Sequence, residues 1–290
     1  NPDQHFDTVL YTDSYSSGNP NKVGGLNFKP DLVWIKAREG SESHSLNDTV
    51  RGTLKRLMSD NSGAENAGGI AEFTQDGFVG SAGYGSDGDG SGKDFVAWCW
   101  KAGNGTVENS DGTIQTTVSA NKAAGFSIVA YQGDGIDNST LGHGLDKAPD
   151  FIISKKRSQS DSWPVWHKNL TTGKDIFLDT TAAEATDGSA ATWGDAWASG
   201  TPVGQLKTFT IGYAGDINAD GQLHIAYCWH SVEGFSKFGS YKGTGNADGP
   251  FVYLGFRPAY VTIKRTDSAD NWNNYDSTRS NTGNPINETL

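Results

Sequence analysis

The chain of 290 residues has little of what disulfide-stapled domains and membrane proteins need. Its two cysteines, Cys99 and Cys228, lie far apart, whereas a disulfide framework needs several closely spaced ones. Aromatic residues flank each of them, so we expect one small buried thiol in each place. No stretch approaches the roughly 20 apolar residues of a membrane helix. Membrane insertion is therefore not expected.

Positive charge is also scarce. Lys and Arg number 23 against 34 Asp and Glu, which gives a net charge of −11. No long basic run occurs, and a nucleic-acid groove needs clustered cations to neutralise phosphates. An acidic surface is equally unsuited to anionic lipid. We therefore expect no nucleic-acid partner.

The chain is rich in glycine and in aromatic residues. It contains 38 Gly, and aromatics make up 11% of it, including 9 Trp. A disordered chain would be poor in aromatics, so this one should fold. Abundant Gly, Ser, Thr, Asn and Asp disfavour helices and favour strands joined by turns. The composition predicts an all-β fold.

One ten-residue phrase occurs three times. It reads "KPDLVWIKAR" at 29–38, "APDFIISKKR" at 148–157 and "RPAYVTIKRT" at 257–266. Two further phrases match each other, "FVAWCW" around Cys99 and "HIAYCW" around Cys228. Because these markers keep their order, we predict tandem antiparallel β-sandwich repeats. The predicted boundaries are 1–116, 117–232 and a partial third repeat at 233–290.

The third copy has no Cys-aromatic phrase, and half a repeat cannot close its own core. The chain also begins "NPDQHFDT" without an initiator methionine. We therefore expect either a piece of a longer protein or a tail that packs against another subunit. A homo-oligomer is the predicted assembly.

The repeated phrase predicts a central strand. Leu32 and Trp34 alternate with Val33 and Ile35, so both faces are apolar and should be covered. Burial is expected to end at the Lys36–Arg38 end of the phrase. A single short helix is predicted at 48–59, with an aspartate as its N-cap.

An Asp/Arg pair follows the phrase in two of the copies. Asp48 precedes Arg51 by three positions, and Asp276 precedes Arg279 in the same way. The second copy departs from this pattern, with His167 and Leu170. We interpret the pair as a structural corner and not as a substrate site.

No recognisable catalytic motif is present. None of the six His sits in a Ser/His/Asp or Cys/His phrase, and no GxSxG, Walker or HExxH pattern occurs. We predict a protein that is not an enzyme. A polysaccharide depolymerase with paired carboxylates stays open as an alternative, because its two acids need only converge in space.

Tryptophan-rich segments at 160–169 and 191–200 have no counterpart in the first copy. Flat aromatic rings beside Asp and Asn suit a sugar, which offers an apolar face and hydroxyl groups. Trp is also enriched at subunit interfaces and can cap a sandwich. The candidates for glycan binding or for an interface are Trp163, Trp166, His167, Trp193 and Trp197.

Acidic turns give weak calcium candidates. "GDINADGQL" supplies Asp216, Asn218 and Asp220 at EF-hand spacing, but its twelfth position is Tyr227, where that motif has Glu. A tight turn needs the same residue types, and we prefer that interpretation. The segment 85–94 is also rich in Asp and Gly, and we interpret it in the same way, as a turn. No metal or other cofactor is expected, calcium being the one exception left open.

Several long phrases carry a resemblance to a known family. They include "GLNFKPDLVWIKAR", "TVSANKAAGFSIVAYQGDG" and, at 232–268, "VEGFSKFGSYKGTGNADGPFVYLGFRPAYVTIKRTDS". The chain resembles a repeat domain in virion structural proteins of tailed bacteriophages, especially marine and cyanobacterial ones. The resemblance supplies no catalytic or ligand residues.

What the resemblance implies is a location in the virion, in the tail or on the outer surface. The expected role is a tail-fibre or tail-tip component that contacts the host surface, with host polysaccharide as a possible ligand and other virion proteins as partners. A purely structural role, as capsid decoration or tail scaffold, is the alternative.

Overall fold

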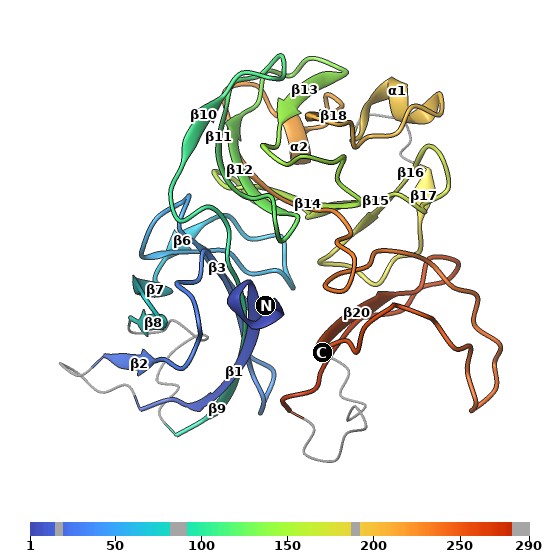
Figure 1. Ribbon diagram of the computed structural model, residues 1–290. Coiled ribbons are helices and arrows are strands. Elements are labelled where there is room, and N and C mark those ends of the chain that lie inside the picture. The colour runs from blue at the N-terminus through green and yellow to red at the C-terminus, as the bar shows by residue number, and fades with distance from the viewer. Residues whose placement is uncertain (15–19, 82–91, 187–191, 280–290) are drawn as a thin grey trace.

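The computed structural model describes residues 1–14, 20–81, 92–186 and 192–279, and these residues form an almost entirely β structure (Figure 1). Helical structure in these ranges is confined to η1 (Pro2–Gln4), α1 (Gly194–Ala198) and α2 (Gly215–Asn218). The predicted all-β fold is confirmed. No helix in the described ranges is long and apolar enough to cross a membrane.

The first unit (residues 1–106) is a sandwich of two sheets. A four-stranded sheet in the order β1-β9-β3-β4 faces a three-stranded sheet in the order β2-β8-β7. Side chains from both sheets, among them Val33, Cys99 and Phe78, form the core between them. A small ladder, β5 with β6, lies beside the sandwich. The strands are β1 (Phe6–Thr12), β2 (Asn21–Val23), β3 (Leu32–Ala37), β4 (Ser45–Asp48), β5 (Lys55–Arg56), β6 (Asn66–Ala67), β7 (Ile70–Thr74), β8 (Gly77–Gly80) and β9 (Asp94–Trp100).

The second unit (residues 107–232) contains an eight-stranded sheet in the order β10-β11-β12-β19-β14-β15-β16-β17 and a two-stranded sheet, β13-β18. Because β10 pairs with β11, this unit begins before the boundary predicted at residue 117. The strands are β10 (Val107–Asn109), β11 (Thr116–Asn121), β12 (Phe126–Gln132), β13 (Ser139–Gly142), β14 (Phe151–Lys156), β15 (Pro164–His167), β16 (Lys174–Phe177), β17 (Ala185–Thr186), β18 (Thr208–Ile211) and β19 (Leu223–Trp229).

The third unit (residues 233–279 as described) contains only a pair of strands, β20 (Tyr260–Lys264) and β21 (Trp272–Asp276). They lie below the second unit in Figure 1, coloured red. The extended segment that precedes them, 235–258, matches β1 and β2 in sequence but enters no named strand.

The three copies of the repeated phrase pair with the next strand in the same register. Leu32 lies opposite Asp48, Phe151 opposite His167, and Tyr260 opposite Asp276. The Cys-aromatic strands β9 and β19 also have matching neighbours, because β9 lies between β1 and β3 and β19 lies between β12 and β14. The three strand pairs therefore share one register.

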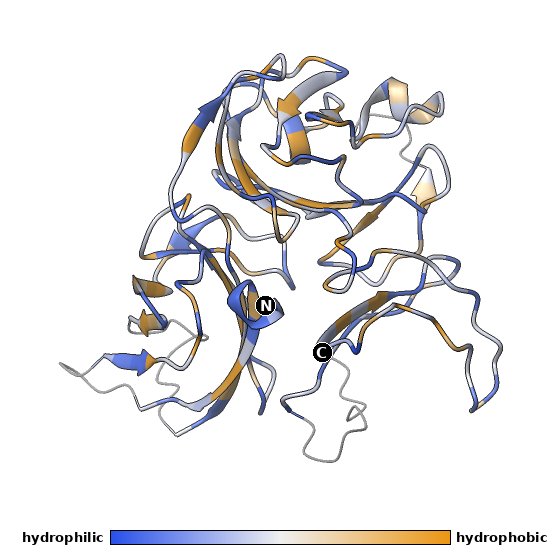
Figure 2. Cartoon of the chain, in the orientation of Figure 1, coloured by the Kyte–Doolittle hydropathy of each residue, from blue (hydrophilic) through white to orange (hydrophobic). Residues whose placement is uncertain are grey.

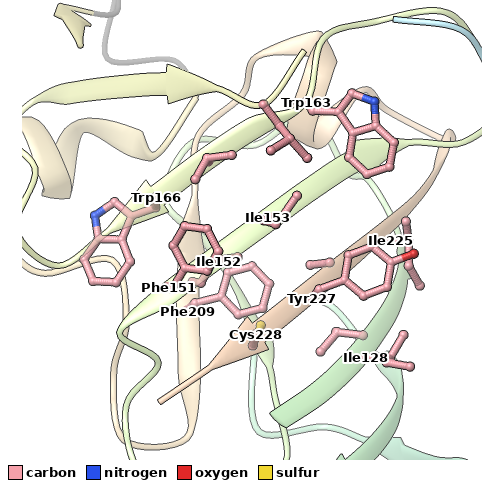
Figure 3. Packing of buried hydrophobic residues seen from close by; sticks show 14 of the residues in the cluster. Ile128, Phe151, Ile152, Ile153, Trp163, Trp166, Phe209, Ile225, Tyr227 and Cys228 are labelled. Atoms are coloured by element: carbon pink, nitrogen blue, oxygen red, sulfur yellow. The ribbon is translucent and has the colours of Figure 1, made fainter. Parts of the chain in front are cut away.

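The strands β3 and β14 are buried on both faces, as predicted, whereas the residues of β20 are only partly buried. Val33 and Ile35 point into the sandwich of the first unit, whereas Leu32 and Trp34 belong to a larger cluster shared with the other units. Figure 2 shows the apolar colour concentrated along these strands, and Figure 3 shows the packing of the larger cluster around β14 and β19. One continuous core therefore joins the units.

The helix predicted at 48–59 is wrong. Asp48 ends β4, and its Oδ1 accepts the Arg51 backbone N–H at 2.8 Å, which forms a turn. Gly52 and Leu54 then have positive φ values of 92° and 57°, which a right-handed helix cannot contain. Leu57 is buried because it forms an isolated bridge with Leu46 of β4, and not because it lies on the apolar face of a helix.

Burial ends within the Lys36–Arg38 end of the phrase, but Lys36 itself lies on the buried side. Lys36 and its counterpart Lys155 are both buried, and exposure begins only at Arg38. The Lys36 ammonium donates to Glu42 O at 2.8 Å, and that of Lys155 donates to the backbone carbonyl of Lys156 at the same distance. The aliphatic part of each lysine side chain is buried, and its ammonium group donates hydrogen bonds to backbone carbonyl oxygens.

Candidate functional site: the junctions between the units

A tryptophan fastens the second unit to the first. Trp163 Nε1 donates to the carbonyl oxygens of Met58 and Asn61, both at 3.0 Å. Lys155 Nζ donates to Ser62 O at 3.3 Å, and the Asp161 N–H donates to the same oxygen at 2.8 Å. The loop at 58–65 of the first unit therefore closes over 155–163 of the second.

The same contacts recur between the second and third units. Trp272 Nε1 donates to Phe177 O at 2.9 Å. Lys264 Nζ donates to Thr181 O at 2.9 Å, and the Asp270 N–H donates to Thr181 O at 2.8 Å. Trp272 stands fourteen residues after Pro258, as Trp163 stands fourteen after Pro149. The second junction thus repeats the first, with loop 177–184 in place of 58–65.

The Asp/Arg pairs also join units. Arg51 Nε donates to Asp48 Oδ2 at 2.5 Å, and Tyr227 of the second unit donates its hydroxyl hydrogen to that same oxygen at 2.8 Å. Burial, the largest cause, raises the Tyr227 pKa far above its ordinary value. The phenol therefore stays protonated and acts as a donor.

Asp276 makes the equivalent contacts in the third unit. Arg279 Nε donates to Asp276 Oδ2 at 2.5 Å, and Trp98 Nε1 of the first unit donates to it at 3.2 Å. The Arg279 guanidinium also lies over the Trp98 ring at 5.4 Å. Both pairs serve structure, in agreement with the sequence interpretation.

A polar cleft of about 690 Å³ lies where all three units meet. Its carboxylates are already engaged: Glu42 pairs with Lys93, Asp60 accepts the His44 N–H at 3.1 Å, and Asp179 accepts the Trp163 N–H at 3.0 Å. The lining residues come from three segments and are Trp34, Lys36, Ala37, Arg38, Gly40, Ser41, Glu42, His44, Ser59, Asp60, Leu178, Asp179, Thr180, Thr181, Asn271, Trp272, Asn274 and Arg279.

The position of the cleft follows from the repeat. Residues 36–44 of the first unit match 155–163 of the second and 264–272 of the third. Loop 58–65 covers the segment 155–163, and loop 177–184 covers the segment 264–272. The matching loop of the third unit would start near residue 286, outside the described residues. The cleft therefore lies beside residues 36–44 of the first unit and 271–279 of the third, with residues 178–181 of the second unit also lining it.

His44 is the histidine of this cleft, and it is held neutral. Its Nδ1 accepts a hydrogen bond from Trp34 Nε1 at 2.7 Å. Burial, and then the positive charges of Lys36 and Arg279, lower its pKa to about 3. At neutral pH it neither carries charge nor offers Nδ1 as a base, so its role in the described structure is to orient Trp34.

The tryptophan candidates do not form a ligand site. Trp163, Trp166, Trp193 and Trp197 are all buried within the chain itself. Trp166 and Trp197 pack edge to face at 5.9 Å, and Figure 3 shows Trp163 and Trp166 packed beside β14. His167 is partly exposed. A sugar cannot stack on the buried rings in this structure.

The calcium candidates lie in and after α2. Asn218 is buried, and its Nδ2 donates to Asp134 Oδ1, Ile136 O and Gly212 O at 2.8–3.0 Å. Its Oδ1 accepts the Asp134 N–H, so the amide ties two turns together. Within the described ranges no three His, Cys, Asp or Glu side chains gather as a metal site would need. The segment 85–94 lies largely outside the described residues.

Both cysteines are free and fully buried, as expected. Burial is the main cause that raises the pKa of Cys99 and of Cys228, so neither forms a thiolate at neutral pH.

Sequence reasoning did not find the cleft. The signal available was the shared fourteenth position after each proline, His44, Trp163 and Trp272. This shared position would have indicated that the three residues lie at equivalent contacts between units.

The fold and its junctions define an all-β protein of β-sheet units that share one core. The chain belongs to a family described as a domain of unknown function, DUF7483, whose sequence profile matches residues 1–290. No curated protein and no solved structure matches it.

Proposed function

We propose that this protein is a structural component of a tailed-bacteriophage particle, in its tail or outer surface. The observation that supports a structural role is the repeated junction: the same tryptophan and lysine contacts fasten the first unit to the second and the second to the third. Of the tryptophans considered for glycan binding, Trp163 is used in these contacts, and Trp166, Trp193 and Trp197 lie in the core. The placement in a virion rests on the sequence resemblance alone.

Immunogold electron microscopy of phage particles whose genome encodes this chain tests the proposal. Antibodies raised against the purified protein should label intact particles at a fixed position, in the tail or on the capsid surface. A control particle from a phage without the gene should stay unlabelled. Absence of label on disrupted and intact particles alike would contradict the proposal.

Contact with a host polysaccharide belongs to the same proposal, and the polar cleft is the place that supports it. A glycan array should then show binding that Arg38→Ala weakens at least tenfold. Lys122→Ala, which changes an exposed ion pair with Asp146, is the matched control and should bind as the natural protein does. No binding would leave the purely structural role in place. Release of reducing ends from a bound polysaccharide would favour the depolymerase instead.

A further inference from the structure

Two of the three matching segments are covered by a loop, and the third borders the polar cleft. Loop 58–65 covers 155–163 and loop 177–184 covers 264–272, whereas the segment 36–44 lines the cleft. The two loops read "MSDNSGAE" and "FLDTTAAE". They share an apolar residue at the first position, Asp at the third, Ser or Thr at the fifth, and Ala-Glu at the end. Their contacts therefore indicate what the cleft should bind.

The carbonyl oxygen at the fifth loop position has two donors in wait for it. Ser62 O and Thr181 O occupy this position, and each accepts a hydrogen bond from one lysine ammonium group and one from a backbone N–H. Lys36 and the Glu42 N–H stand at the matching places in the first unit, and both residues line the cleft. Within the described ranges Lys36 Nζ donates to Glu42 O alone, and the Glu42 N–H has no backbone acceptor. Both donors can therefore bind a carbonyl oxygen that enters the cleft.

His44 supplies a third donor. At the other two junctions a tryptophan indole donates to the carbonyl oxygen at the first loop position, Met58 O or Phe177 O. His44 stands where these tryptophans stand and is 6% exposed. Its Nδ1 accepts Trp34 Nε1, so the neutral ring carries its proton on Nε2, and no residue in the described ranges accepts that proton. A nearly buried donor that lines a cleft without a partner indicates a missing acceptor.

The aspartate at the third loop position also has a matching donor. Asp60 Oδ1 accepts the His44 N–H at 3.1 Å, and Asp179 Oδ1 accepts the Trp163 N–H at 3.0 Å. Trp272 stands at the third matching place and lines the cleft. It belongs to a non-hydrogen-bonded pair of the β20–β21 ladder, so its N–H points away from β20. Among the residues that the structure describes, no carboxylate accepts this N–H.

The glutamate at the end of the loop matches Arg38. At the first junction Arg157 Nε and Nη2 donate to the two carboxylate oxygens of Glu65 at 2.9 and 3.1 Å. Arg38 stands at the place of Arg157 and lines the cleft, and its ion pair with Asp94 is long, at 3.8 Å. An incoming glutamate can therefore pair with Arg38 in the bidentate manner of Glu65.

We propose that the cleft is a docking site for a loop of a partner protein, with the pattern apolar–x–Asp–x–Ser/Thr–small–Ala–Glu. The loop binds through two backbone carbonyl groups and two carboxylates. A second copy of this chain is a poor source, because its loops 58–65 and 177–184 already take part in its own junctions. This inference does not rest on the proposed role in a virion. A polysaccharide in the same cleft would compete with the loop.

The experiment uses a labelled synthetic peptide that copies residues 58–65, with both ends blocked. Fluorescence anisotropy measures its binding to the 290-residue protein, and NMR of the isotope-labelled protein follows the His44 ring N–H and the Trp272 backbone N–H. We expect saturable binding in the millimolar range or below, which is the effective concentration of a tethered loop, and shifts of both signals. A scrambled peptide of the same composition is the control and should not bind.

A double-mutant cycle tests the pairing with Arg38. Arg38→Ala should weaken peptide binding about tenfold, and Glu65→Gln in the peptide should weaken binding to the natural protein by a similar factor. The two changes remove the same ion pair, so the altered peptide should bind the Arg38→Ala variant no more weakly than the original peptide does. Lys122→Ala, at an exposed ion pair with Asp146, is the matched control and should leave binding unchanged. Urea unfolding checks that both protein variants fold.

The proposal is overturned if the peptide does not bind at about 5 mM. Occupation of the cleft by residues 280–290 of the same chain would give this result. The proposal is also overturned if the effects of Arg38→Ala and Glu65→Gln simply add, or if binding leaves the His44 and Trp272 signals unchanged. A glycan that shifts these two signals, when the peptide does not, would assign the cleft to a polysaccharide.

Discussion

Tyr227 of the second unit donates its hydroxyl hydrogen to Oδ2 of Asp48 in the first unit, and Asp48 is the carboxylate that neutralises buried Arg51. A single oxygen thus serves an inter-unit bond and a buried ion pair. Trp98 and Asp276 make the equivalent contact between the first and third units. The units are consequently joined through buried charges.

Tyr227→Phe removes this inter-unit hydrogen bond while leaving the ring in place. We expect the free energy of unfolding to fall by about 1–3 kcal/mol, because the buried carboxylate loses a donor. Urea unfolding followed by tryptophan fluorescence measures the change. Tyr213→Phe, at an exposed position, is the matched control and should change stability by less than about 0.5 kcal/mol. Equal effects of the two substitutions would contradict the role of Tyr227.

Asp48→Asn should cost more than the loss of the tyrosine hydroxyl. The Arg51 guanidinium would remain buried, with Glu65 at 3.2 Å as its remaining anionic partner. Removing one member of a buried pair costs about 3–5 kcal/mol. Asp267→Asn breaks the exposed pair with Arg265 and should change stability far less. A comparable loss in both variants, measured by urea unfolding, would show that burial of the Asp48–Arg51 pair has no special importance.

Acid should destabilise the protein through its buried histidines. Burial is the largest cause that lowers the pKa of His224 to about 3 from its usual 6.5. A group whose pKa is depressed by folding contributes stability that is complete above pH 6.5 and declines as the pH falls toward 3. At pH 5 the cost for His224 is about 2 kcal/mol relative to pH 8.

His224→Phe isolates this contribution. The imidazole stacks on the Tyr131 ring at 5.1 Å, so an aromatic replacement keeps the packing. The variant should lose less stability between pH 8 and pH 5 than the natural protein, as measured by thermal unfolding. Parallel pH profiles for the two proteins would show that His224 does not contribute to the acid sensitivity.

The two thiols should be inert in the folded protein. Cys99 and Cys228 have no exposed surface, and burial raises the pKa of both. Ellman's reagent should therefore detect no thiol in native buffer and two in 6 M guanidinium chloride. A thiol that reacts quickly in native buffer would show that a Cys-aromatic strand opens locally.

Much of the fold follows from short patterns. The alternation in "DLVWIK" identified a strand buried on both faces, because both sets of side chains are apolar. The helix at 48–59 could not be excluded by spacing alone, since the positive φ of Leu54 depends on the neighbouring hairpin. The burial of Lys36 depends on a distant carbonyl oxygen, Glu42 O, which no local pattern reveals.

The candidate site was less predictable than the fold. Trp163 looked like a loop residue because its segment lacks a counterpart in the first copy, yet its indole donates to Met58 O across a junction. The sequence indicated that the tryptophans are important, but it did not show that the Trp163 indole lies at a contact between units. Only the arrangement of the units shows that these rings hold units together.

Hydrogen exchange of the free protein, resolved to single amides, tests the central claim that β3 and β14 are paired on both edges, whereas β20 is paired on one edge within the described residues. The account predicts slow exchange at Trp34 in β3 and at the matching Ile153 in β14, close to the rate of global unfolding. Fast exchange is predicted at Thr262 in β20, whose N–H faces the edge that no described strand covers. Protection of Thr262 equal to that of Trp34, in a monomeric sample, would contradict it.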